Sequence, residues 1–239
     1  MRFSTPLKRG RLLQRYKRFL ADIALDDGAT ITATCPNTGS MMGLSAPGVA
    51  VWVSESDSPT RKYRHTWELV EAEGGKGVAF VGINTGHPNT LVAEAIEAGR
   101  IVALAGYASR RREQKYGKAS RIDLLLEDPE KGRAYVEIKN VHLLRRAGLA
   151  EFPDSVTERG AKHLEELGDM VEAGHRAVML YLVQRGDVRR FAIARDIDPG
   201  YGAALDRALA RGVEVLAYDC RVSAEEIAVG RPIKLEIGT

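Results

Sequence analysis

Apolar and polar positions follow a strand period through the first third of the chain. ATITATC (29–35) alternates, VAVWVS (49–54) is apolar and β-branched, and HTWELVEAE (65–73) leads through glycines into VAFVGIN (78–84). Short strands separated by glycine turns predict a small barrel or curled sheet. We therefore expect a β-rich first domain over residues 1–86.

The period changes to that of a helix within residues 86–101, where Leu91, Val92, Ala95 and Ile96 share one face and Asn89 or Thr90 can cap the start. Amphipathic helices are also expected at 155–174 and 199–212. Apolar runs at 176–183 and 213–220 predict buried strands, and LLRRAGLAEFPD (143–154) is interpreted as a polar loop. The order α, β, β, β, α, β, α, β predicts a mixed α/β sheet with helices on its faces over residues 87–239.

Composition narrows the class of protein. The 239 residues are 44% hydrophobic and 28% charged, as in ordinary globular proteins, and no apolar run approaches the length of a membrane span. The basic N-terminus lacks the apolar core of a signal peptide. Cys35 and Cys220 are the only cysteines, which argues against a disulfide framework or a CxxC zinc site. We expect a cytoplasmic protein with no membrane partner.

RIDLLLEDPEKGRAYVEIKN (121–140) predicts a hairpin with unusual charges. If its turn centres on residue 130, opposite residues have numbers that add up to 260, so that Asp123 faces Glu137. Lys139 lies two residues beyond Glu137 and therefore on the same side of its strand. The three side chains are expected to converge on one patch.

Two carboxylates at close range repel unless a cation separates them. Mg²⁺ (or Mn²⁺) prefers oxygen ligands and keeps several waters, and it would place Asp123 and Glu137 in a metal site. With Lys139 beside it, such a site has the parts for metal-assisted phosphodiester cleavage. The alternative is a surface hairpin in which Lys139 forms ordinary ion pairs with both acids. The apolar residues around the charges in VEIKNVHL favour the buried site.

An Asp, a turn and ExK in this order of elements resemble the PD-(D/E)xK nuclease superfamily. CPNTGSM, QKYGKASRIDLLL, YVEIKNVHL and FPDSVTERGAKHLEEL further resemble the sugar fermentation stimulation protein family. The resemblance implies an OB-like β-barrel, a restriction-endonuclease-like second domain and an association with DNA. It implies that Asp123 and Glu137 bind metal, that Lys139 is the catalytic or orienting lysine, and that Glu94 is the extra acid on the preceding helix.

Basic residues suggest where a nucleic acid binds. The first 121 residues carry a net charge of +7 and the remainder −4, and basic stripes of this kind favour phosphate backbones. Arg159 and Lys162 start the 155–174 helix, and one face of that helix is expected to point toward the hairpin. The predicted DNA contacts are Arg110, Arg111, Arg112 and Lys115, followed by Arg9, Arg11, Arg15, Lys17 and Arg18.

The leading hypothesis is a protein that binds double-stranded DNA with little sequence preference and carries a Mg²⁺-dependent deoxyribonuclease-type site. Two alternatives stay open: a non-catalytic DNA-binding regulator of sugar metabolism, and an RNA-binding or RNA-processing protein. The sequence does not decide whether the chain forms a homodimer.

Overall fold

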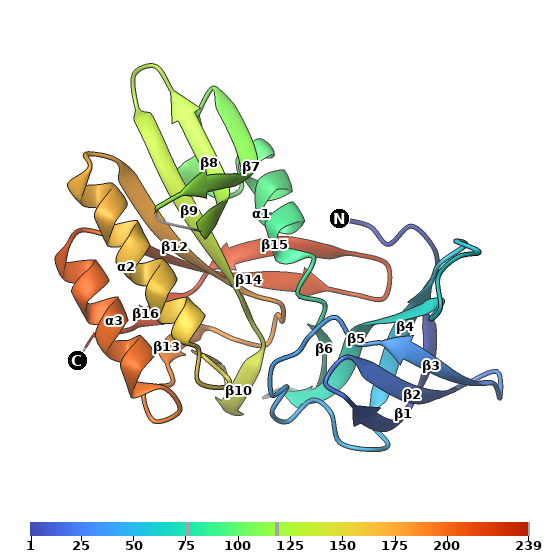
Figure 1. The fold of residues 1–239 in the computed structure, drawn as a ribbon. Coiled ribbons are helices and arrows are strands. Elements are labelled where there is room, and N and C mark those ends of the chain that lie inside the picture. Colours follow the sequence, from blue (N-terminus) through green and yellow to red (C-terminus); the bar gives the residue numbers. More distant parts are fainter. Residues whose placement is uncertain (75–76, 118–119, 239) are drawn as a thin grey trace.

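The computed structural model describes residues 1–74, 77–117 and 120–238. The first part is a barrel of six strands in the order β3-β2-β1-β4-β5-β6, and an additional β3–β5 pairing closes it (Figure 1). Its core contains Leu12, Ile23, Val53 and Trp67, all essentially inaccessible to solvent. The strands are β1 (Lys8–Tyr16), β2 (Leu20–Leu25), β3 (Thr30–Thr34), β4 (Ala50–Glu55), β5 (His65–Gly74) and β6 (Gly77–Gly82).

The second part is built on a mixed sheet in the order β15-β14-β12-β9-β8-β7. β12 runs parallel to both β9 and β14, while the outer pairs are antiparallel. Its strands are β7 (Ser109–Tyr116), β8 (Ser120–Asp128), β9 (Gly132–Val141), β12 (Arg176–Val183), β14 (Glu214–Val222) and β15 (Ile227–Pro232). The predicted fold class, a barrel followed by a mixed α/β domain, is confirmed.

Helices cover both faces of this sheet (Figure 1). α1 (Pro88–Glu97) packs on one face, and α2 (Glu158–Glu172) and α3 (Pro199–Ala210) pack on the other. A short 3₁₀ turn, η1 (Val102–Leu104), follows α1. Thr157 caps α2, because its hydroxyl accepts a hydrogen bond from Gly160 N at 3.1 Å. No helix among the described residues is long and apolar enough to cross a membrane.

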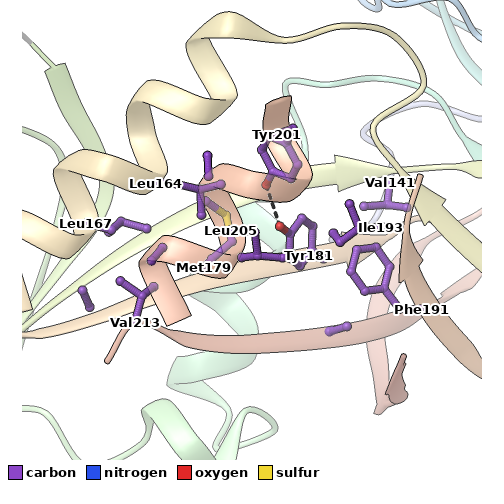
Figure 2. Packing of buried hydrophobic residues seen from close by; sticks show 14 of the residues in the cluster. Val141, Leu164, Leu167, Met179, Tyr181, Phe191, Ile193, Tyr201, Leu205 and Val213 are labelled. Carbon is purple, nitrogen blue, oxygen red and sulfur yellow. Dashed lines mark hydrogen bonds between the residues drawn. The ribbon is translucent and has the colours of Figure 1, made fainter. Parts of the chain in front are cut away.

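The core beneath α2 and α3 is mainly apolar and contains a hydrogen bond between two tyrosines. Met179 and Tyr181 project from β12 between Leu164 of α2 and Leu205 of α3 (Figure 2). The hydroxyls of Tyr181 and Tyr201 are 2.5 Å apart and satisfy one another in this buried setting. The packing fixes α2 against the sheet and so determines which of its side chains reach β9.

The prediction of a loop over 143–154 is wrong. β10 (Leu143–Arg146) and β11 (Leu149–Phe152) form a hairpin there, turning at Gly148, whose φ of +73° suits glycine. β11 also pairs with β13 (Arg190–Ile193), and β13 pairs with β16 (Lys234–Glu236) in a second sheet. Each strand has only three or four residues, too few to show a strand period.

Candidate functional site

The β8–β9 hairpin has the predicted register. Pairs from Leu124↔Val136 to Asp128↔Gly132 all have numbers that add up to 260. The backbone pairing of β8 with β9 ends at Leu124 and does not include Asp123. There the Asp123 side chain bonds to β9 instead, because its Oδ2 accepts a hydrogen bond from Ile138 N at 2.7 Å. Asp123 is thereby fixed where the two strands separate.

Glu137 is the most deeply buried acid of the site, with 2% of its surface exposed. Its Oε1 accepts a hydrogen bond from Lys139 Nζ at 2.7 Å and contacts His163 Nδ1 of α2. Its Oε2 is buried and has no hydrogen-bond partner among the described residues. A buried carboxylate oxygen without a donor is costly, and nothing in the described part of the chain offsets the burial of this atom.

The two acids have opposite pKa shifts. Burial, and secondly the nearby charge of Glu137, raise the pKa of Asp123. Burial also raises the pKa of Glu137, but the His163 hydrogen bond and the Lys139 charge outweigh it, so the net shift is downward. Repulsion from Glu137 therefore adds to burial in raising the pKa of Asp123, and a cation between the two carboxylates would relieve it.

His163 links this pair to the start of α2. Arg159 Nε donates to His163 Nε2 at 3.3 Å, and a guanidinium has no acceptor, so Nε2 carries no proton. The ring proton then lies on Nδ1 and is donated to Glu137 Oε1. His163 is 5% exposed, whereas Arg159 is exposed. Of the two predicted α2 residues, Arg159 thus reaches the acids through His163.

A further acid, Glu166, lies one turn along α2 from His163. It is 5% exposed, and neither of its carboxylate oxygens has a hydrogen-bond partner among the described residues. Lys162 Nζ is 3.6 Å from Oε1. The buried hydroxyl of Tyr116 is likewise unpaired, and burial, followed by Glu137, Glu166 and Asp123, raises its pKa. Lys162 therefore approaches Glu166 rather than the acids of the hairpin.

The structure does not bring Glu94 to the hairpin. Its Oε2 lies 2.8 Å from the N-terminal ammonium of Met1, and its side chain is half exposed. Asn89 is the α1 residue that reaches the site: its Nδ2 donates to Asp123 Oδ1 at 2.8 Å and to Glu113 Oε1 at 3.3 Å. Five residues of helix separate Asn89 from Glu94 and turn Glu94 by about 140°.

Asn89 or Thr90 was expected to cap α1, but neither does so, and the Asn89 amide donates to Asp123 instead. His87 is the cap residue of α1 and makes no side-chain cap bond. Glu113 on β7 is the exposed acid that shares the Asn89 amide with Asp123. It has a φ of +53°, which is uncommon for a residue other than glycine. The described residues include no salt bridge to Glu113, and its Oε1 accepts a hydrogen bond from Asn89 Nδ2.

The basic residues of β7 divide into two kinds. Arg110 pairs with Glu97 at 3.2 Å and Arg111 with Glu127 at 2.5 Å. Arg112 and Lys115 are exposed and have no carboxylate within salt-bridge distance among the described residues. β7 is an edge strand of the sheet and pairs with β8, the strand that carries Asp123, so these two charges are open to solvent on the neighbouring strand.

Most of the N-terminal basic residues donate hydrogen bonds to other groups of the barrel. Arg9 binds Glu71 through Nε at 3.0 Å and Nη2 at 3.3 Å. Arg15 donates to the carbonyls of loop residues 37 and 39, at 2.8 and 2.9 Å, and Arg11 donates to the carbonyl of residue 48. Lys17 and Arg18 occupy the exposed β1–β2 turn. Their role in DNA binding stays a prediction.

His163, Glu166 and Asn89 were not identified as site residues from the sequence. Arg159, His163 and Glu166 have the spacing i, i+4, i+7 and so share one helical face, which was a usable signal. The spacing did not reveal what that face packs against. Asn89 gave no signal, because its partner Asp123 is 34 residues away.

Comparison with known protein families agrees with this architecture. Residues 13–83 match the family described as "SfsA N-terminal OB domain", and residues 86–226 match "Sugar fermentation stimulation protein RE domain". The chain belongs to the sugar fermentation stimulation protein family. The first match confirms the OB-like barrel, while the division into domains at residue 86 stays a prediction.

Individual relatives match along almost their full length. The sugar fermentation stimulation protein homolog of Rhizobium meliloti is 61% identical over 99% of this chain and 97% of its own. That of Rhodospirillum centenum is 60% identical over 98% of this chain and 99% of its own. The Pyrococcus furiosus SfsA structure, solved in complex with Ca²⁺, has a TM-score of 0.86 at 26% identity and covers 99% of this chain and 98% of that one.

Proposed function

We propose that this family member is a DNA-binding protein with a site for Mg²⁺ or Mn²⁺ at Asp123 and Glu137 that supports phosphodiester hydrolysis. The observation that carries the proposal is that Oε2 of buried Glu137 has no hydrogen-bond partner in the described part of the chain and lies close enough to a second carboxylate, Asp123, to influence its pKa. Such an arrangement is unfavourable by itself and becomes favourable when a cation joins the two acids.

The donor set fits a hard divalent cation. Both side chains offer carboxylate oxygens, and Asn89 and Ile138 N hold Asp123 in place. Among the described residues no group of three or more His, Cys, Asp or Glu could hold a metal ion. Mg²⁺ commonly uses one or two carboxylates and completes its shell with water and phosphate oxygens. The Ca²⁺ complex of P. furiosus SfsA supports divalent-cation binding in this family.

The protein's own residues have distinct roles in this proposal. Lys139, 15% exposed at its side chain, places a positive charge next to Glu137 and can donate to a phosphate oxygen. His163 holds Glu137 through its Nδ1 proton and leaves Oε2 free. A bound Mg²⁺ would supply Lewis acidity and lower the pKa of a water molecule.

Exposed cations on two elements that adjoin the hairpin support DNA as the partner. Arg112 and Lys115 lie on β7, which pairs with β8, and Arg159 of α2 donates to His163. Contacts from such residues to phosphates give salt-dependent affinity with little sequence preference. Double-stranded DNA is the proposed partner, and RNA is the competing polymer that the experiment must include.

The test is a cleavage and binding assay. Circular DNA, linear DNA and RNA are incubated with the full chain in Mg²⁺, Mn²⁺ or EDTA, beside Asp123→Asn and Lys139→Ala. Glu94→Gln is the matched control, because that acid lies on α1 with its carboxylate on Met1. We expect metal-dependent nicking that is lost in the first two variants and retained in the control.

Other outcomes identify the alternatives. DNA binding without cleavage in any metal would contradict hydrolysis and support the non-catalytic regulator. Cleavage of RNA in preference to DNA would show that RNA, and not DNA, is the partner. Equal cleavage by Asp123→Asn and the unmodified chain would refute the assignment of the site.

A further inference from the structure

A cavity of about 970 Å³ lies at the junction of the barrel and the second domain. The barrel is fixed there by a strand contact: Gly82 N donates to Gln184 O at 2.8 Å, and Val81 pairs with Arg185. Residues 78–80 of β6 form one wall of the cavity. The opposite walls come from residues 186–189 and from β14 and β15. A cavity of this size between two domains is typical of small-ligand sites.

The β6 wall is apolar. Val78 is 70% exposed, which is unusual for a large aliphatic side chain, and Phe80 is half-buried beside it. The Phe80 ring packs edge-to-face on Trp52 with 5.7 Å between the centroids. Trp52 in turn donates to Glu71 at 3.0 Å, which fixes its position. This wall offers a supported apolar surface to a flat ring.

The opposite walls are basic. Arg100, Arg189, Arg221 and Arg231 line the cavity, and all four are exposed. The first three have no carboxylate within salt-bridge distance in the described part of the chain. An unneutralised group of guanidinium ions favours phosphate, because the planar fork of arginine matches two phosphate oxygens.

The two acids that line the cavity already accept hydrogen bonds from other groups of the protein. Asp187 receives two hydrogen bonds from buried Arg185, at 2.7 and 2.8 Å. Asp219, which is 4% exposed, accepts from Arg231 N at 2.5 Å. These internal bonds leave the arginines in excess and keep the cavity electropositive.

Two glycines show that the wall depends on close backbone approach. A Cβ at Gly186 would lie 2.9 Å from the carbonyl oxygen of Cys220, and one at Gly230 would lie 2.2 Å from Asp219 Oδ1. Both positions therefore require glycine for the present packing. The cavity is therefore bounded by closely packed backbone as well as by side chains.

From the pairing of an aromatic-lined apolar wall with an arginine wall, we propose that this cavity binds a nucleotide unit. The base lies against Val78 and Phe80, and the phosphate is held by Arg189 and Arg221. A free mononucleotide and a single strand of nucleic acid share this chemistry. The proposed cleavage site is elsewhere on the sheet, on β8 and β9, so the inference does not rest on that function.

The test uses the full chain in EDTA, with calorimetry as the main measurement and the change in tryptophan emission as a second signal. Trp52, which packs on Phe80, is the half-buried tryptophan, and Trp67 is buried in the barrel core. Thymidine 5′-monophosphate and an eight-residue oligothymidylate are compared with thymidine and with inorganic phosphate. We expect saturable binding of a nucleotide-containing ligand, with thymidine and phosphate at least about tenfold weaker. Arg189→Ala with Arg221→Ala should weaken binding by about tenfold or more.

Arg64→Ala is the control, because this exposed arginine lies on the barrel outside the cavity and bonds Ser56 O. Tighter binding of the oligomer than of the monomer identifies a strand as the ligand, and the reverse identifies a free nucleotide. The proposal is overturned if neither binds saturably, if phosphate alone binds as tightly, or if the folded double variant keeps full affinity. Asp123→Asn should bind normally in EDTA, which separates this result from the cleavage assay.

Discussion

Asp154 ties the second domain to the barrel, and its replacement by Asn should weaken that connection in a pH-dependent way. Its Oδ2 accepts hydrogen bonds from Met41 N at 3.0 Å and Ser40 Oγ at 3.1 Å, and His142 Nε2 is 3.3 Å away. Burial raises the pKa of Asp154, but His142, Met41 and Ser40 outweigh it and lower the pKa to about 2.

The lowered pKa of Asp154 gives the size of its contribution to the free energy of unfolding. A shift of nearly two units corresponds to roughly 2.5 kcal/mol. The side chain is partly solvated, and His142 Nε2 has no aligned hydrogen bond, so we discount this to about 1–2 kcal/mol. Because the pKa is depressed in the folded state, this stability is present above about pH 4 and is lost as the pH falls toward 2.

Urea unfolding followed by circular dichroism measures the effect. Asp154→Asn should lower the free energy of unfolding by about 1–2 kcal/mol at pH 7, with a smaller difference from the unmodified chain at pH 3. Asp196→Asn is the control: Arg145 lowers the pKa of Asp196 to about 2 as well, but that pair is on the surface and should contribute far less. An equal loss at pH 7 and pH 3 would refute the electrostatic explanation.

Three further changes test the surroundings of the acids. Gly117→Ala should lower the free energy of unfolding by about 1–2 kcal/mol, because φ is +56° and the new Cβ would lie 3.1 Å from Glu166 Oε1. An unchanged free energy in urea unfolding would argue against that packing. His163→Ala should cost roughly 1.5–3 kcal/mol in the same assay, since the buried Glu137 carboxylate loses one of its two donors and keeps only Lys139, and a loss below about 0.5 kcal/mol would contradict the contact. Arg112→Ala with Lys115→Ala should reduce the slope of log affinity for DNA against log salt by about 2, and an unchanged slope would remove β7 from the interface.

The hairpin at the centre of the site could be predicted because its determinants are local. Asp128 Oδ1 accepts from Glu130 N and Lys131 N, both at 3.0 Å, and Gly132 has a φ of +73°. A turn built within five residues fixes the register of both strands, and the register placed Asp123 opposite Glu137.

The rest of the site depends on packing between distant segments, which periodicity does not encode. Glu94 and Asn89 occur on the same helix, and only the docking of α1 decides that Asn89 contacts Asp123. His163 reaches Glu137 because Leu164 and Leu167, on the same helix, are buried against the sheet. The β10–β11 hairpin was missed for a different reason, since short strands that carry arginines look like a loop.

The most direct measurement is a calorimetric titration of Mn²⁺ into the full chain, with Asp123→Asn and Glu94→Gln beside it. We predict saturable binding by the unmodified chain, loss of that binding in Asp123→Asn, and retention in Glu94→Gln. Absence of binding by the unmodified chain, or equal binding by Asp123→Asn, would contradict a divalent ion held between Asp123 and Glu137.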